Sequence, residues 1–265
     1  MPGLLCLVCA RACEPAFSKD FGGTFGLGRV EYVGCPDCGT CVSKTHYELP
    51  SEAWGALNER YHQQYFGSSA NADDARWMER LGEQAAVFSE LQKQGVLPKG
   101  PVLDWGCGDG QLADRLTAAG VRCEKFDRYV KPPGGLLEPA LVAGSFGVVL
   151  NTSVVEHVRE RRTLDEIAGL VSADGIVAMH TIICEVVPRD PSWFYLLPVH
   201  CTFLTNEAMR RLCAEWGFVA TLYDVPARLW LLFRNLPQAR RAFDALQPTR
   251  TAIHFKEGFI DFWKG

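Results

Sequence analysis

The sequence predicts an α/β protein in which a doubly wound, largely parallel sheet follows a small cysteine-rich module. One observation is the order of a short apolar strand, a glycine-rich turn and a helical pattern over residues 101–119. That order is typical of the ligand-binding corner of a doubly wound sheet. The other observation is that six of the eleven cysteines lie in the first 41 residues, a clustering that favours metal binding over disulfide formation.

Length and composition are those of a globular protein. The chain has 265 residues, 48% hydrophobic and 22% charged, enough for one large domain with a small appendage. Its net charge of −4 counts against a general nucleic-acid binder, which would be basic. No apolar run approaches the roughly 18 residues of a membrane span. The apolar segment 4–10 lacks a basic region and contains two cysteines, unlike a signal peptide, so we expect a cytoplasmic protein.

Two CxxC pairs near the N-terminus are separated by 25 residues. Each pair can direct two thiolates at one ion, and two pairs complete a tetrahedral shell of four sulfurs. The spacing therefore predicts a zinc ribbon over residues 1–48 that binds a structural Zn²⁺. The predicted ligands are Cys6, Cys9, Cys35 and Cys38.

Three further residues of this module leave alternatives open. Cys13 or Cys41 can replace a neighbouring cysteine as ligand, and His46 is a weaker alternative. We favour the interpretation that both cysteines are small buried apolar residues. The module carries four basic and five acidic residues, too little positive charge to hold phosphates. We interpret it as a structural module or a surface for docking a partner or substrate.

Residues 49–98 are predicted to form a helical connector. The aromatic side chains within 51–66 either pack between ribbon and core or form a lid over a bound cofactor. Asp73 or Asp74 is predicted to cap a helix that runs to about Gln94, because apolar residues recur there at helical spacing.

The glycine-rich turn indicates which kind of ligand the sheet binds. Asp104 ends the apolar strand, and glycines follow at positions 106, 108 and 110. The dinucleotide fingerprint GxGxxG fails because Gln111 stands where its third glycine belongs, and no Walker loop is present. A carboxylate at the strand end would repel a pyrophosphate, whereas it suits a ligand that carries an ammonium group.

The segment 102–110 resembles the first motif of the class I S-adenosylmethionine (SAM)-dependent methyltransferases. Segments ending at Phe126-Asp127 and covering 148–158 and 173–181 resemble the family's second, fourth and fifth strands. The resemblance covers about residues 95–235. It implies a SAM-binding methyltransferase domain at 99–235 with a Rossmann-like, seven-stranded sheet, and SAM-dependent methyl transfer as the activity.

Two later segments add to the resemblance. Residues 200–209 resemble a part of the family in which a histidine precedes a helix, with Thr205 as the N-cap. Residues 216–234 resemble the antiparallel hairpin that closes the sheet.

The resemblance also implies a set of cofactor-binding residues. Asp104 would organise the ammonium end of the methionine moiety, and Gly106 and Gly108 would let the backbone approach the ligand, since a Cβ would fill that space. Asp127 ends a strand, where a carboxylate can accept both ribose hydroxyls. The full set is Asp104, Gly106, Gly108, Gly110, Asp127 and Asn151.

The sequence departs from the family pattern in two places. Only 18 residues lie between Asp127 and Phe146, and they include Pro-Pro-Gly-Gly at 132–135. We predict that the helix usually found there is lost and that the third strand is shortened, so that the sheet is reduced. Gly147 stands where the family often has Asp, which predicts an altered adenine pocket with cofactor binding retained.

Three histidines are candidates for catalysis: His157, His180 and His200. They follow strands at the carboxyl edge of the predicted sheet, where open α/β sheets bind ligands, and an oxygen or nitrogen acceptor gains from a base that removes its proton. Each histidine can instead be structural. Glu156 beside His157 can bind a metal, but nothing else nearby in the sequence completes a site, so no catalytic metal is expected.

Two segments near the end of the chain complete the prediction. Trp193 and Tyr195 lie in an insertion over the acceptor site, where they either stack on a sugar or aromatic acceptor or form a packed flap. Residues 236–265 are predicted to form a C-terminal strap that starts with a short amphipathic helix, or alternatively a dimer contact. The sequence does not predict the oligomeric state.

The predicted function is SAM-dependent methylation of a small-molecule acceptor. The resemblance extends to bacterial members of the family with an N-terminal zinc ribbon, many of which look like participants in polysaccharide or natural-product pathways. It therefore implies a sugar or another biosynthetic intermediate as the acceptor. The alternative is a protein or RNA methyltransferase whose ribbon docks the substrate, although the ribbon's charge counts against nucleic acid. A third hypothesis is an inactive binding module, against which the intact Asp104, glycine turn and Asp127 argue.

Overall fold

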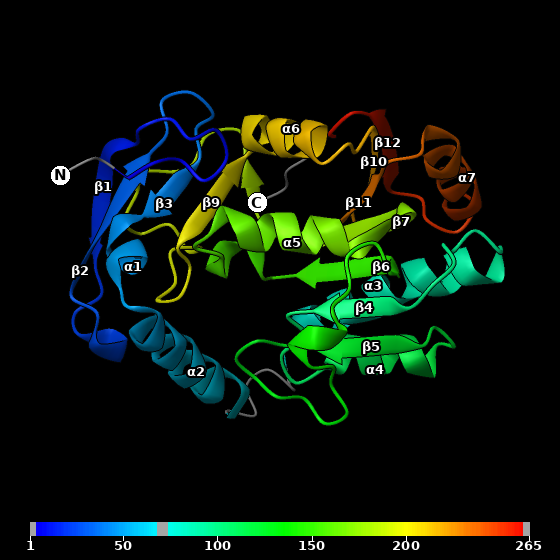
Figure 1. Cartoon of the computed structure of the whole chain (residues 1–265), viewed down its shortest axis with the longest axis horizontal. Coiled ribbons are helices and arrows are strands. Elements are labelled where there is room, and N and C mark those ends of the chain that lie inside the picture. The colour runs from blue at the N-terminus through cyan, green and yellow to red at the C-terminus, as the bar shows by residue number, and fades with distance from the viewer. Residues whose placement is uncertain (1–3, 68–73, 262–265) are drawn as a thin grey trace.

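The structure is a computed structural model that describes residues 4–67 and 74–261, and it contains two sheets (Figure 1). The larger sheet has seven strands in the order β12-β10-β11-β7-β6-β4-β5. Strands β4 to β7 are parallel, and β11, β10 and β12 continue the sheet antiparallel. The strands are β4 (Val102–Trp105), β5 (Cys123–Phe126), β6 (Phe146–Thr152), β7 (Val171–His180), β10 (Ala220–Asp224), β11 (Leu229–Phe233) and β12 (Ile253–Glu257).

Helices cover both faces of this sheet, which confirms the doubly wound α/β fold. Within β6, Val148 and Leu150 pack with helices α3, α4 and α7, whereas Val149 packs with α5 and α6. Both faces of the strand are therefore apolar, as a central parallel strand requires. The helices are α3 (Ala75–Lys93), α4 (Gln111–Ala118), α5 (Arg161–Leu170), α6 (Asn206–Glu215) and α7 (Leu236–Leu246).

Two predicted helix caps are present. Asp74 precedes α3, and its side chain accepts hydrogen bonds from the backbone N–H groups of Arg76 and Trp77. Thr205 precedes α6, and its hydroxyl accepts a hydrogen bond from the N–H of Ala208. In both cases the side-chain oxygen satisfies a donor that the first helical turn leaves without a partner.

The third strand of the family pattern is missing, not merely shortened. Between β5 and β6 the described chain forms only the 3₁₀ turn η2 (Glu138–Ala140), and Leu136 N–H donates a single bond of 2.7 Å to Lys125 O. The prolines at 132 and 133 lack an N–H for a ladder, and the segment is too short for a crossover. The sheet keeps seven strands because β12 adds one at the opposite edge.

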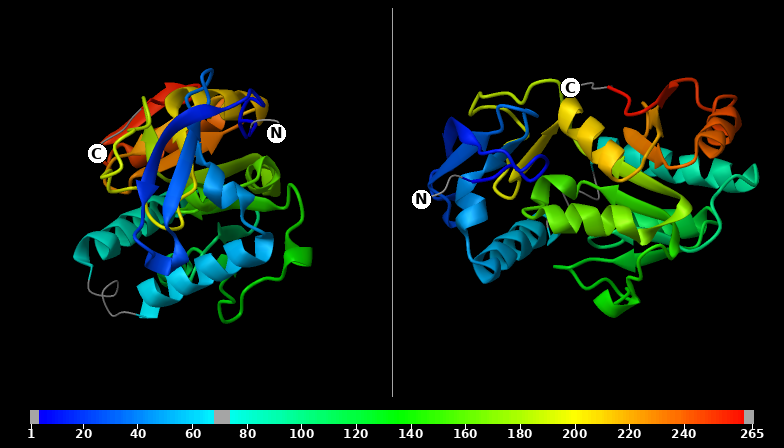
Figure 2. Two further views of the ribbon diagram at one scale, coloured as in Figure 1. Left: turned by 90° about the vertical axis from the view of Figure 1, so that its left-hand side faces the viewer. Right: turned by 45° about the horizontal axis from the view of Figure 1, so that its top comes forward.

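The smaller sheet joins the N-terminal module (residues 4–48) to the rest of the chain. Its order is β1-β2-β3-β9-β8, and β3 pairs antiparallel with β9, which follows the large sheet's β7 in sequence. Figure 2 shows β9 (yellow) beside the blue strands of the module. The elements are β1 (Glu14–Asp20), η1 (Thr24–Gly26), β2 (Arg29–Gly34), β3 (Cys41–Ser43), α1 (Lys44–Glu48), α2 (Ser51–Gly67), β8 (Ile183–Cys184) and β9 (Thr202–Thr205).

Candidate functional site

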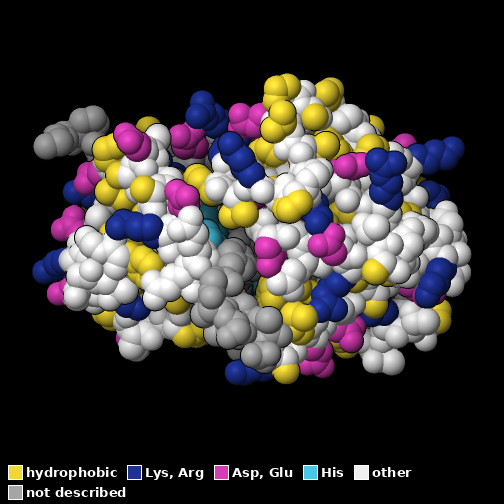
Figure 3. Space-filling model, turned by 90° about the horizontal axis from the view of Figure 1, so that it is seen from below, with side chains coloured by type: hydrophobic (Ala, Val, Ile, Leu, Met, Phe, Trp, Pro, Cys, Tyr) yellow, Lys and Arg dark blue, Asp and Glu magenta, His cyan; other side chains and the backbone are white. Residues whose placement is uncertain are grey.

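A cavity of about 650 Å³ lies at the carboxyl ends of β4, β6 and β7. This size is within the range in which proteins bind small molecules and cofactors. The glycine turn after β4 and the three candidate histidines line the same cavity, together with residues from α2 and α3. Figure 3 shows a histidine side chain (cyan) inside a hollow of the surface seen from below.

The glycine turn has a backbone that only glycine adopts without strain. Gly106 has φ +78°, and a Cβ at this position would lie 2.5 Å from Val154 Cγ2. Gly108 and Gly110 also have positive φ, and Gly110 is the N-cap residue of α4. The N–H of Gly106 donates to Phe126 O at 2.7 Å. The turn therefore curls tightly between two strand ends and presents its backbone to the cavity.

Asp104 is the acid that the sequence placed at the end of β4. It is 1% exposed and lines the cavity, and its Oδ1 atom has no hydrogen-bond partner in the described part of the chain. Burial, followed by the charge of Asp127, raises the pKa of Asp104 to about 7. A buried carboxyl group with an unused oxygen is a binding point for a cationic group such as an ammonium.

Asp127 follows β5 and organises the backbone around it. Its Oδ2 accepts from Gly108 N–H at 2.9 Å, and its Oδ1 accepts from the N–H groups of Tyr129 and Val130 at 2.8 Å each. The carboxylate thereby links the glycine turn to the segment after β5. Each oxygen of an ionised carboxylate has two lone pairs. Both pairs of Oδ1 are used, whereas Oδ2 keeps one that can accept a ligand hydroxyl from the cavity side.

Three other positions named from the sequence, Gly110, Asn151 and Gly147, are not among the residues that line the cavity. Asn151 is fully buried in β6, and neither atom of its amide has a partner within the described residues. Gly147 lies at the other end of β6, where a Cβ would come within 2.6 Å of Lys99 O. The structure thus gives Gly147 a packing reason.

His180 uses both of its ring nitrogens. Nε2 lies 2.9 Å from Arg80 Nη1, and Nδ1 lies 2.7 Å from Arg228 O. Because a guanidinium only donates and a carbonyl only accepts, Nε2 is the acceptor and Nδ1 carries the proton. Burial and the nearby Arg80 charge lower the pKa of His180 to about 3. A role as base would require breaking one of these bonds.

His157 and His200 lie together, with ring centroids 4.9 Å apart. His157 is in the 3₁₀ turn η3 (Val155–His157), and His200 precedes β9. One ligand atom from each of these histidines and one from Glu156 all lie within 4.8 Å of one another; we call these three residues the Glu–His–His cluster. Burial lowers the pKa of His200 to about 3 and that of His157 well below its usual value.

Two hydroxyl groups hold the carboxylate of Glu156. Tyr195 Oη donates to Glu156 Oε1 at 2.6 Å, and Thr181 Oγ1 donates to Oε2 at 3.0 Å. Of the two aromatic residues that the sequence placed over the acceptor site, Tyr195 lines the cavity, whereas Trp193 packs against Phe203. Sequence reasoning missed Thr181 and this pairing, because no local pattern links residues that are 14 to 44 positions apart.

The four predicted zinc ligands converge in the N-terminal module. Their sulfur atoms all lie within 4.8 Å of one another, with Cys9 and Cys35 3.4 Å apart and Cys6 and Cys38 3.5 Å apart. Four thiolates around one zinc ion lie about 3.8 Å apart, so the cluster fits zinc.

The remaining candidates of this module are not among the four clustered cysteines. Cys13 is only partly buried, beside the core that contains them. Cys41 lies in β3, between β2 and β9, and is buried in an aromatic core. His46 hydrogen-bonds Ser43 Oγ through Nδ1 at 2.6 Å and Pro198 O through Nε2 at 2.9 Å. His46 therefore joins the module to the segment that carries His200.

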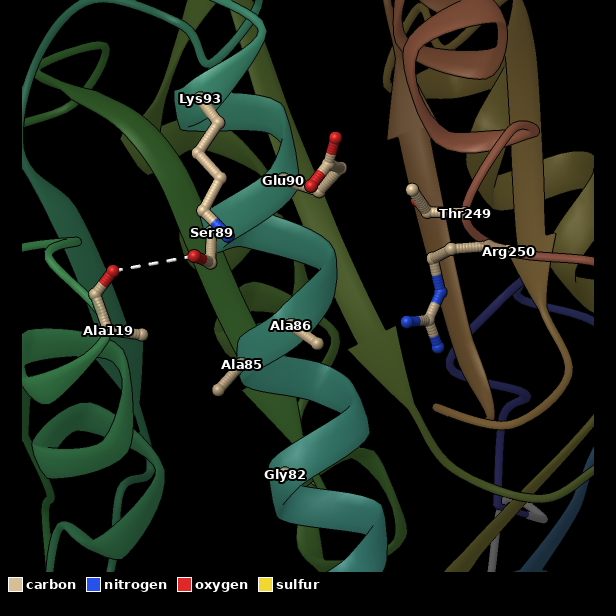
Figure 4. A pocket seen from close by; sticks show the side chains of 9 residues that line it. All are labelled: Gly82, Ala85, Ala86, Ser89, Glu90, Lys93, Ala119, Thr249 and Arg250. Atoms are coloured by element: carbon tan, nitrogen blue, oxygen red, sulfur yellow. Dashed lines mark hydrogen bonds between the residues drawn. The ribbon is translucent and has the colours of Figure 1, made fainter.

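A second, shallower hollow of about 360 Å³ lies between α3 and the turn after α7 (Figure 4). Small residues of α3 form its floor, and Arg250 forms its opposite wall. The guanidinium of Arg250 is already paired with Asp224 and Glu83. Ser89 and Thr249 of its lining are likewise bonded to backbone carbonyls.

The fold and the cavity together indicate the class of protein. A doubly wound sheet binds nucleotide-type cofactors at the carboxyl ends of its strands, and the buried Asp104 suits a cofactor that carries positive charge. Residues 75–222 match the methyltransferase domain family, which is more than half of the 265-residue chain. The chain belongs to this family and is a SAM-dependent methyltransferase. A comparison with curated proteins finds no match.

Solved structures of methyltransferases resemble the chain at low sequence identity. A SAM-dependent methyltransferase from Thermotoga maritima is 17% identical, with 69% of this chain and 100% of that chain covered and a TM-score of 0.39. Magnesium protoporphyrin IX methyltransferase from Synechocystis is 19% identical, with 67% of this chain and 100% of that chain covered and a TM-score of 0.43. 1,6-Didemethyltoxoflavin-N1-methyltransferase from Burkholderia thailandensis is 15% identical, with 75% of this chain and 96% of that chain covered and a TM-score of 0.47. In the described chain no helix has the length and apolarity of a membrane span.

Proposed function

We propose that the protein transfers the methyl group of SAM to a small-molecule biosynthetic intermediate, such as a sugar or a precursor of a polysaccharide or natural product. The observation that carries this proposal is that one cavity is lined both by the glycine turn with Asp104 and Asp127 and by the Glu–His–His cluster. Cofactor and acceptor can therefore meet inside a single enclosure.

The residues around the glycine turn fit the cofactor. Asp104 has an unused carboxylate oxygen for the ammonium group, and Gly106 has no space for a Cβ. We assign Asp127 to the ribose hydroxyls, because its carboxylate is held in place by three backbone N–H groups. When bound, SAM supplies an electrophilic methyl group on a sulfonium.

The Glu–His–His cluster is assigned to the acceptor. Methyl transfer is an in-line displacement, and holding the acceptor close to the methyl carbon supplies much of the rate enhancement. The cluster consists of unprotonated imidazoles and a carboxylate, groups that favour loss of a proton from a bound acceptor. His180 serves beside them by holding Arg80 at the cavity wall.

The lining of the cavity favours a small acceptor over a macromolecule. His157 and His200 are buried or nearly so, and Tyr61 of α2 and Tyr195 lie around the same space. A side chain or base of a macromolecule would have to enter past these residues. We therefore assign the N-terminal module a structural role, with zinc held by its four cysteines.

The experiment that tests the cofactor site is calorimetry of SAM binding to Asp127→Ala. Loss of a charge-assisted hydrogen bond of roughly 1.5–3 kcal/mol lowers the affinity at least about tenfold. Asp114→Ala is the matched control, because Asp114 is an acid of the neighbouring helix α4 outside the cavity lining. Equal SAM affinity in both variants would contradict the site.

The acceptor class is tested with SAM that carries a labelled methyl group. Purified enzyme is incubated with fractions of a bacterial extract that contain small molecules, RNA or protein. We expect label in the small-molecule fraction. Label only in RNA or protein would instead establish the macromolecular alternative.

A further inference from the structure

The hydrogen bonds around the Glu–His–His cluster decide where its lone pairs lie. His200 Nδ1 is 2.8 Å from Tyr195 O. A carbonyl only accepts, so Nδ1 carries the ring proton and Nε2 keeps its lone pair. Tyr195 O therefore fixes the tautomer of His200 and leaves an electron-pair donor on the other side of the ring.

His157 belongs to the same cluster. Its Nδ1 is buried and has no hydrogen-bond partner in the described chain. In the tautomer with the proton on Nε2, this atom carries a lone pair.

Glu156 adds a third electron-pair donor. Both of its oxygens receive O–H bonds, from Tyr195 and Thr181, so the carboxylate has the bonding pattern of the ionised form. It is 2% exposed, and no Lys, Arg or His of the described residues forms an ion pair with it. A buried carboxylate without a cationic partner carries a high desolvation cost.

One ligand atom from each of the three residues therefore lies within 4.8 Å of the other two, in the lining of the cavity. Lone pairs that meet at this spacing repel one another unless a proton or a cation lies among them. Two imidazoles and one carboxylate, with remaining positions open, form the ligand set of many first-row divalent metal sites. His200 and Glu156 also have the outer hydrogen bonds that normally orient a metal ligand: Tyr195 O for His200, and two hydroxyls for Glu156.

We propose that Glu156, His157 and His200 bind a first-row divalent cation whose open positions face the cavity and take two neighbouring oxygens of the acceptor. This inference rests on the proposed function and narrows its acceptor to a molecule with adjacent oxygens, such as a vicinal diol or a hydroxy-ketone. Coordination lowers the pKa of an acceptor hydroxyl. That hydroxyl loses its proton to water, its oxygen bonds to the methyl carbon, and the electron pair of the broken carbon–sulfur bond stays on sulfur.

The test is calorimetric titration of the full-length protein with Mn²⁺, which binds oxygen and nitrogen ligands in preference to a four-thiolate site. We expect one Mn²⁺ per chain. Glu156→Gln should lower the Mn²⁺ affinity at least about a hundredfold, and Tyr195→Phe, which removes an outer hydrogen bond, about 10–100-fold. His254→Gln, on the distant strand β12, is the control and should bind Mn²⁺ like the parent.

SAM binding is measured on the same samples to separate the two proposals. Absence of Mn²⁺ binding, or equal binding by Glu156→Gln, overturns the metal site when SAM still binds, and it leaves the proposed function intact. Loss of SAM binding by the parent protein would overturn the proposed function itself. Variants that bind SAM normally are folded, so a lost metal response in them reports on the cluster.

Discussion

At the residue scale, Asp104, which we propose binds the ammonium group of the cofactor, is an acid with a raised pKa. Its carboxyl group is enclosed at the end of β4, and its pKa is raised to about 7, mainly by burial. The ordinary pKa of Asp is about 3.9, so near neutral pH a fraction of the free protein holds Asp104 in its neutral form. A cationic ligand binds the charged form.

This predicts that cofactor affinity rises with pH across the neutral range. At pH 6 about a tenth of the molecules carry a charged Asp104, and the apparent affinity is reduced by that fraction. We expect S-adenosylhomocysteine, which keeps the ammonium group, to bind about tenfold more tightly at pH 8 than at pH 6. Calorimetry across this range measures it. Asp104→Asn should bind more weakly with a flat profile, whereas a parent profile equally flat would exclude this role of Asp104.

At the element scale, the N-terminal module pairs with β9, the strand that follows His200, and contacts the residues before it. Strand β3 pairs with β9, and Ser43 N–H donates to Cys201 O at 2.8 Å. His46 bonds to Pro198 O, and Arg159 donates to the carbonyls of His46 and Leu49. The module that carries the four clustered cysteines thus contacts residues 198–205 through a shared sheet.

Replacing Cys35 by Ser tests this connection. A ribbon owes much of its folding free energy to its metal, so the variant should lose zinc and unfold residues 1–48 while the large sheet stays folded. Because β9 pairs with the module, residues 198–205 should also lose protection against amide hydrogen exchange. Hydrogen exchange followed by mass spectrometry would show faster exchange in both segments and unchanged exchange in β4 to β7.

Cys123→Ser is the matched control for this experiment, because Cys123 lies in β5 and is not one of the four clustered cysteines. It should change exchange in neither segment. Protection of 198–205 in the Cys35→Ser protein would show that β9 holds its place without the module.

At the scale of the whole molecule, the features predicted correctly are those that depend on residues close together in the sequence. The acid at the end of β4, the glycine turn, the Thr205 cap and the paired cysteines each have a short-range signature. The pairing of β3 with β9 joins residues about 160 positions apart, and no local pattern specifies it. Glu156 and His200 are also far apart in the sequence. The sequence therefore named His200 as a candidate but did not place it beside Glu156 and His157.

The C-terminal segment contains a strand that the sequence analysis did not predict, although its local pattern is present. Residues 253–257 alternate between partly buried and exposed side chains, and they pair with β10 as the edge strand β12. The sequence Ile-His-Phe-Lys-Glu has this alternation, a signal of a half-buried strand, yet the segment was expected to be a strap. The aromatic end of the tail at Phe262 and Trp263 lies outside the described residues.

The last prediction concerns the ion pairs that fasten this tail to the body. Arg250, whose side chain is 8% exposed, pairs with the fully buried Asp224 of β10 and with Glu83 of α3. Removing one partner of a buried pair costs about 3–5 kcal/mol, because the other charge stays buried without compensation. Arg250→Ala should therefore lower the melting temperature by roughly 10 °C. Arg240→Ala removes an exposed pair with Glu257, worth at most about 1 kcal/mol, and should melt within about 3 °C of the parent in scanning calorimetry. Equal shifts in the two variants would show that the Arg250 pairs do not hold the tail.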